Sequence, residues 1–72
     1  MSATTPLAKI LEDANANKME VTEIEYDRII LSDNGNEYII RIWDIDEKEA
    51  TWTLYKMSEK GGNKVKSGVT IF

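Results

Sequence analysis

The chain contains no cysteine and no histidine among its 72 residues. Without cysteine it has no disulfide and no thiolate zinc site to stabilise its fold. Without histidine it also lacks the commonest general base and the usual nitrogen ligand of zinc. These absences argue against an enzyme, and we expect a protein with no catalytic residue, no cofactor and no metal.

Paired carboxylates are the remaining chemical option, because two acids can hydrolyse a glycosidic bond. The candidate pairs are Glu12 with Asp13, Glu23 with Glu25, and Asp44 with Asp46. That reaction needs a deep sugar-binding cleft, which so short a chain cannot easily build. The segment 44–49 superficially resembles a calcium loop but lacks the glycine and the final acid that such a loop requires. We therefore expect solvated charges and no small-molecule substrate.

Long apolar runs are absent as well, since none exceeds the length of Ile29–Leu31. No secretory signal is evident, and we expect a soluble, cytoplasmic protein that does not enter a membrane. The length suits one domain, residues 1–72, which buries only about 60% of the surface that its unfolded chain exposes. Good packing or oligomerisation must therefore support the fold.

Charge is unevenly distributed along the chain. Thirteen acidic and nine basic residues give a net charge of -4. Residues 1–49 hold twelve of the acids and five of the bases, whereas residues 50–72 hold one acid and four lysines. The negative total argues against a broad nucleic-acid surface. The asymmetry is typical of complementary charge on neighbouring strands.

The N-terminal segment has the spacing of an amphipathic helix. Its apolar residues recur at intervals of three and four, at Leu7, Ile10, Leu11 and Ala14. Thr5 is a suitable N-cap, and Pro6 suits the first helical position because its missing N–H is not needed there. Residues 15–17, Asn-Ala-Asn, are expected to end the helix.

After the helix the chain is rich in isoleucine, valine, threonine and aromatic residues with period-two alternation. Turn signals interrupt this pattern at residues 33–36, 46–49 and 61–63. We therefore predict an α+β fold, with one N-terminal amphipathic helix packed on a four-stranded antiparallel β-meander.

Charge pairing favours particular registers. A two-residue loop at Asn34-Gly35 would set Arg28 opposite Arg41, whereas a three-residue loop over 33–35 sets Asp27 opposite Arg41. We prefer the second loop because it avoids the repulsion. A turn at residues 47–48 then predicts Trp43 opposite Trp52, and a third hairpin predicts Met57 opposite Val65.

These registers sort the strand residues into two faces. The expected core face, covered by the helix, comprises Ile24, Tyr26, Ile30, Tyr38, Ile40, Ile42, Tyr55, Met57, Val65, Val69 and Ile71, with Arg28 as its charged exception. The expected uncovered face comprises Ile29, Leu31, Ile39, Trp43, Trp52, Leu54 and Phe72 among charged residues.

Two tryptophans on an uncovered face indicate a contact surface, because tryptophan and arginine are enriched among binding hot spots. We expect a protein–protein interaction module that acts through this face, with a protein partner or a second copy in a homodimer. The expected contact residues are Ile39, Arg41, Trp43, Trp52 and Leu54. A cross-strand aromatic pair that only stiffens the sheet is the alternative without a partner.

Two further functions stay open. The same face could bind single-stranded nucleic acid, since aromatic rings stack on bases while Arg41, Lys56 and Lys66 contact phosphates. Glu25 and Asp27 on that face oppose this interpretation. An acidic inhibitor or DNA-mimicking decoy of bacterial or phage type would need a denser negative surface than a charge of -4 supplies.

Overall fold

The computed structural model describes residues 6–72, and the expected N-cap Thr5 lies outside them. One helix, α1 (Pro6–Asp13), precedes one antiparallel sheet whose strands are ordered as in the sequence. The strands are β1 (Glu20–Glu25), β2 (Arg28–Asp33), β3 (Asn36–Ile45), β4 (Glu49–Ser58) and β5 (Gly61–Ile71). The α+β class and the antiparallel meander are confirmed, whereas the predicted number of four strands is wrong. Within the described part of the chain, no helix is long and apolar enough to cross a membrane.

The additional strand arises from a turn that carries no conventional signal. Tyr26 and Asp27 reverse the chain so that Glu25 pairs with Arg28. Hairpin loops of two residues usually reveal themselves by glycine or asparagine at positive φ, and neither residue of this turn has a positive φ. The turn signals in the sequence therefore predict a single strand before residue 33, where the structure has two.

The helix ends in a Schellman motif, where the sequence predicts it. Asn15 takes the left-handed conformation, with φ of 60°. The Ala16 N–H donates to the Leu11 carbonyl at 2.7 Å, and the Asn15 N–H donates to the Glu12 carbonyl at 3.0 Å. This motif turns the chain back toward the sheet and buries Ala16 completely.

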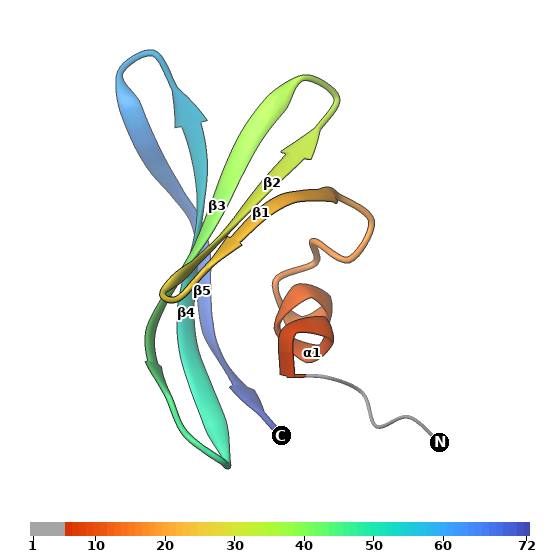
Figure 1. Cartoon of the computed structure of the whole chain (residues 1–72). Helices are drawn as coiled ribbons and strands as arrows, with labels where there is room; N and C mark the ends of the chain where they lie inside the picture. The colour runs from red at the N-terminus through yellow and green to blue at the C-terminus, as the bar shows by residue number, and fades with distance from the viewer. Residues whose placement is uncertain (1–5) are drawn as a thin grey trace.

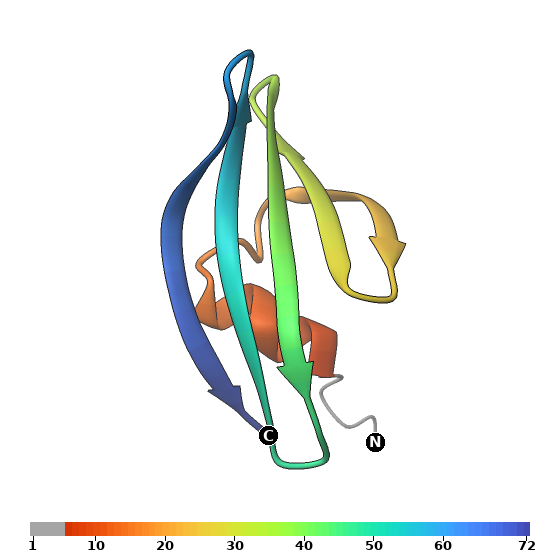
Figure 2. The ribbon, with the colours of Figure 1, turned by 90° about the vertical axis from the view of Figure 1, so that its left-hand side faces the viewer.

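Helix α1 covers one side of the sheet only (Figure 1). We call this side the helix face and define it by Ile29, Leu31, Ile40, Trp52 and Leu54, all buried. They form the core together with Ile10, Ala14, Ala16 and Ala50. We call the opposite side of the sheet the open face, and it is turned toward the viewer in Figure 2 with α1 behind it. Its members are Arg28, Ile30, Ile39, Arg41, Trp43, Thr53, Tyr55, Met57 and Val69.

The β2–β3 hairpin uses the two-residue Asn34-Gly35 loop, so the preferred three-residue loop is wrong. Both loop residues have positive φ, 50° for Asn34 and 82° for Gly35, as a type I′ turn requires. Arg28 consequently lies opposite Arg41. The repulsion between opposed like charges is modest, about 0.2–1 kcal/mol. Turn geometry therefore outweighs it, and the one-residue difference in register moves every β2 side chain to the other face.

A β-bulge at Trp43 separates the two tryptophans. Ile45 pairs with Ala50 as predicted, but the register shifts between Ile42 and Asp44, so Trp52 pairs with Ile42. The expected pairing of Trp43 with Trp52 is therefore wrong. Because a bulge inserts one extra residue into one strand, the alternation beyond it is reversed. Trp52 lies on the helix face and Trp43 on the open face.

These shifts explain why the expected faces are inverted on three strands. On β3 the assignment of Tyr38, Ile40 and Ile42 to the helix side is correct. On β2 and β4 the inward and outward sets are exchanged, because the core contains Ile29, Leu31, Trp52 and Leu54. In the last hairpin Met57 pairs with Gly62 and Thr51 with Val69, and another bulge falls at Val65. Val69 is therefore on the open face, 47% exposed.

Candidate functional site

The open face is an apolar surface with charged groups at its centre. Trp43 is 52% exposed, and Ile30, Ile39, Tyr55 and Met57 are half-buried among their neighbours. No element within residues 6–72 packs over it, since α1 lies behind the sheet (Figure 2). An antiparallel sheet commonly leaves one face to solvent, but that face is then polar. Here the sequence places isoleucine, methionine and aromatic side chains on it instead.

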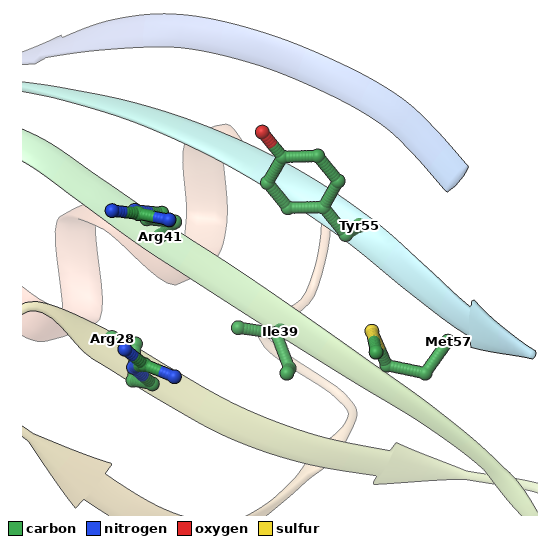
Figure 3. Close-up of a pocket in the computed structure, with 5 residues that line it drawn as sticks. All are labelled: Arg28, Ile39, Arg41, Tyr55 and Met57. Atoms are coloured by element: carbon green, nitrogen blue, oxygen red, sulfur yellow. The ribbon is translucent and has the colours of Figure 1, made fainter. Parts of the chain in front are cut away.

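The centre of this face is a shallow hollow of about 130 Å³ (Figure 3). Five residues line it, Arg28, Ile39, Arg41, Tyr55 and Met57. They come from three adjacent strands, with Arg28 opposite Arg41 across β2 and β3, and Ile39 opposite Tyr55 across β3 and β4. In Figure 3 the two guanidinium groups lie at one end and Met57 at the other, with Ile39 between them. The hollow therefore has a cationic end and an apolar end.

The two guanidinium groups differ in how they are compensated. Arg28 Nε donates to Asp27 Oδ1 at 3.3 Å, and this hydrogen bond is the main cause that lowers the pKa of Asp27; burial opposes it, and the charges of Arg28 and Arg41 add to the lowering. This is the one ion pair found within residues 6–72. Arg41 has no carboxylate partner there, and its Cζ lies 4.4 Å from the ring centroid of Trp43. Cation–π contact does not neutralise the charge of a guanidinium. Arg41 therefore remains available to an anion.

Trp43 is positioned by two contacts on the open face. Its Nε1–H donates to Thr53 Oγ1 at 2.9 Å, while the Arg41 guanidinium lies over its ring. Thr53 is only 7% exposed although it faces away from the helix. The bulge that displaces Trp43 from the ladder thus directs its ring back over the sheet. The remaining exposed area of the indole is presented to solvent.

The predicted contact residues fall into two groups. Ile39, Arg41 and Trp43 lie together on the open face, as the sequence predicts. Trp52 and Leu54 lie in the core beneath α1, 1% and 3% exposed. The Trp52 Nε1–H donates to the buried Thr70 Oγ1 at 2.8 Å. Neither Trp52 nor Leu54 is accessible at the surface of this fold.

Arg28, Tyr55 and Met57 complete the hollow, although the registers expected from the sequence put them on the core face. The Asn34-Gly35 pair is a signal for Arg28, because a type I′ turn there fixes the β2–β3 register, whereas the faces of Tyr55 and Met57 depend on the β3–β4 register that the bulge at Trp43 shifts. Arg28 gave a second signal, since a charged residue amid an apolar set seldom belongs to a core.

The remaining surface offers weaker candidates. Tyr26 is fully exposed in the β1–β2 turn. Together with Ile45 it lines another shallow hollow of the surface. The Asp46 carboxylate accepts hydrogen bonds from the Lys48 and Glu49 N–H groups, at 2.7 and 2.9 Å, and these bonds lower its pKa. It therefore organises the β3–β4 turn. No cluster of three or more His, Cys, Asp or Glu suited to a metal occurs in the part of the chain that the structure describes.

Known proteins add nothing to this description, because no family model, no curated protein and no solved structure matches the chain.

Proposed function

We propose that this protein is a non-enzymatic protein-binding module whose contact surface is the open face. The observation that carries the proposal is the group of Ile39, Arg41, Trp43 and Tyr55, which share a face that nothing in residues 6–72 covers. Tryptophan, tyrosine and arginine are the residues most enriched in binding hot spots. Exposed apolar patches with polar rims mark interaction surfaces more often than they mark ordinary solvated surface.

The chemistry of the hollow favours binding over catalysis. Its lining provides two guanidinium groups, one phenol and two apolar side chains, with no carboxylate or imidazole to act as a base. Guanidinium groups are donors and a fixed positive charge, so they recognise anions without exchanging protons. The geometry supports recognition of a partner's surface.

A second copy of the chain is one form that the partner can take. The solution mass, measured by light scattering after size exclusion at two protein concentrations, tests it. If the chain forms a dimer through the open face, Val69→Glu dissociates the dimer, because a carboxylate then enters an apolar contact. Lys56→Glu changes a residue whose register places it on the helix side, so this control leaves the mass unchanged.

A foreign partner is tested by selecting random dodecapeptides on the full chain. We expect the selected peptides to lose at least about tenfold in affinity on Val69→Glu and on Trp43→Ala, and to bind Lys56→Glu as they bind the wild type. If the chain is monomeric and its peptides bind all variants equally, the open face is not the contact surface.

Single-stranded nucleic acid is the second candidate, because Arg28 and Arg41 lie beside Trp43 and Tyr55 on one face. Burial of Trp52 weakens this candidate, since it leaves one exposed indole instead of two. Oligothymidylate titrated at low salt tests it through Trp43 fluorescence. Quenching that disappears as salt rises would favour nucleic acid over protein.

A further inference from the structure

On the basis of the proposed function, we infer that the hollow selects protein segments in which an acidic side chain adjoins an apolar one. The carboxylate binds between Arg28 and Arg41, and the apolar neighbour packs on Ile39 and Met57. This arrangement matches the two ends of the hollow, cationic at the arginines and apolar toward Met57 (Figure 3).

The charge balance of the hollow argues for a carboxylate. Arg28 and Arg41 are directly opposed on neighbouring strands, which is unfavourable for like charges. Within the described residues Asp27 forms its ion pair with Arg28, and its weaker electrostatic interaction with Arg41 leaves that guanidinium, which lies over the Trp43 ring, without a hydrogen-bonded carboxylate. A carboxylate that accepts hydrogen bonds from both guanidinium groups would relieve this repulsion. Arginine is also the residue whose planar fork suits a carboxylate best.

A symmetric second copy does not supply that carboxylate. In a two-fold contact centred on the hollow, Arg28 and Arg41 of one copy would meet the same residues of the other. Four guanidinium groups would then face one another with only the two Asp27 carboxylates beside them, and juxtaposed like charges suppress association. The hollow therefore favours a different chain with an acidic residue at the centre of its contact.

A nucleic-acid strand fits the hollow less well than an acidic peptide. Phosphates follow one another along a strand, so the bound strand needs a track of cations and not one isolated pair. Toward β1, the register places Glu25 opposite Arg28 and Glu23 opposite Ile30. Carboxylates at this margin would repel a phosphate backbone that continues past the arginines. A single acidic side chain avoids them.

Selection of random dodecapeptides on the full chain, followed by a double-mutant cycle, tests this inference. We expect the binding peptides to share an Asp or Glu next to an aliphatic or aromatic residue. Replacing that acid by its amide should weaken binding to the wild type about tenfold, as for one charge-assisted hydrogen-bonded contact. The same replacement should cost Arg41→Gln less than about threefold in affinity, because only Arg28 then remains to contact the acid and Arg28 is already paired with Asp27.

Lys56→Gln is the matched control. It removes the same charge from β4, but its register opposite Tyr38 places it away from the hollow. Replacing the acid of the peptide by its amide should lower the affinity for Lys56→Gln as much as it lowers the affinity for the wild type. Circular dichroism of each variant confirms that the fold is retained.

The outcomes separate this inference from the proposed function. The inference is overturned if the selected peptides show no preference for an acidic residue. It is also overturned if replacing the acid by its amide lowers the affinity for Arg41→Gln as much as it lowers the affinity for the wild type. If such peptides still lose affinity on Val69→Glu, the open face remains the contact surface. Three outcomes overturn both the inference and the proposed function. They are peptides whose affinity is unchanged by Arg41→Gln and by Val69→Glu, a library that yields no binder, and tighter binding of oligothymidylate than of any peptide.

Discussion

Trp43 and Trp52 lie on adjacent strands of one sheet and point to opposite faces of it. Trp52 is buried under α1 with its indole N–H bonded to Thr70, whereas Trp43 lies half-exposed with its indole N–H bonded to Thr53. The bulge in β3 produces this separation. One tryptophan consequently serves the fold, and the other is free to serve a contact.

The two tryptophans should therefore differ in their effect on stability. Trp52→Ala is expected to cost about 3–5 kcal/mol, because it opens a large cavity in a small core. A domain of this size has little stability to lose, so this variant should be largely unfolded. Trp43→Ala should cost about 1 kcal/mol, since it removes one hydrogen bond and one exposed cation–π contact.

Urea denaturation followed by circular dichroism measures both costs. The single substitution Trp43→Phe supplies a further check, because its remaining emission comes from Trp52 alone. That emission should be blue-shifted relative to the wild type and protected from acrylamide. Equal costs for the two alanine variants would contradict the assignment of faces.

The two indole hydrogen bonds offer a matched pair of threonine substitutions. Thr70→Val should destabilise the fold by about 1–3 kcal/mol, because it leaves the buried Trp52 N–H without an acceptor. Thr53→Val should cost less, since the half-exposed Trp43 indole can turn toward water. Thermal unfolding of the two variants gives the comparison. A larger loss for Thr53→Val would show that Trp43 is the better buried of the two.

Gly68 allows Trp52 to pack closely against β5. A Cβ at this position would lie 3.1 Å from Trp52 Cζ2, and the indole cannot easily retreat because Thr70 holds it. Gly68→Ala should therefore cost about 1–3 kcal/mol through overpacking.

Gly62 provides the control for that substitution. A Cβ there would lie 3.2 Å from the Met57 sulfur, the flexible end of a side chain that can move aside. Gly62→Ala should change the free energy of unfolding by less than about 0.5 kcal/mol. If both alanine variants lose the same stability in urea denaturation, close packing against Trp52 is not the cause.

Asp46 should make the stability depend on acid pH. Its two backbone hydrogen bonds lower its pKa in the folded chain below the ordinary value of 3.8. Its stabilising contribution is then fully present above that value and is lost as the pH falls through the lower folded pKa. The midpoint of thermal unfolding at several pH values between about 5 and 2 should fall more steeply for the wild type than for Asp46→Asn. Parallel curves for the two proteins would exclude this role.

Much of the fold follows from local signals in the sequence. The apolar spacing from Leu7 to Ala14 locates the helix, Asn15 ends it, and the alternation after residue 20 indicates an antiparallel sheet. Local signals could not show where the register shifts along β3, and therefore which side chains of β4 lie on which face of the sheet. A bulge at Trp43 and a turn at Tyr26-Asp27 without glycine leave no compositional trace, yet each changes which side chains share a face.

The candidate site shows the same division. The sequence is sufficient to place Ile39, Arg41 and Trp43 on one face, because they belong to one strand and alternate along it. Trp52 and Leu54 belong to the neighbouring strand, and the bulge shifts the register that would put them on the same face. A register that avoids the repulsion between Arg28 and Arg41 puts Arg28 in the core, but the Asn34-Gly35 turn is the stronger determinant of the register here.

The most direct test of the account is to map a selected peptide onto the chain by methyl nuclear magnetic resonance. Methyl groups report on one face of a sheet, unlike backbone amides, which lie in its plane. We predict shifts at Ile39, Met57 and Val69 and unchanged signals from Ile10 and Leu31 in the core beneath α1. Shifts confined to residues near α1, with the methyl groups of the open face unchanged, would contradict the central claim that this protein binds its partner through the open face.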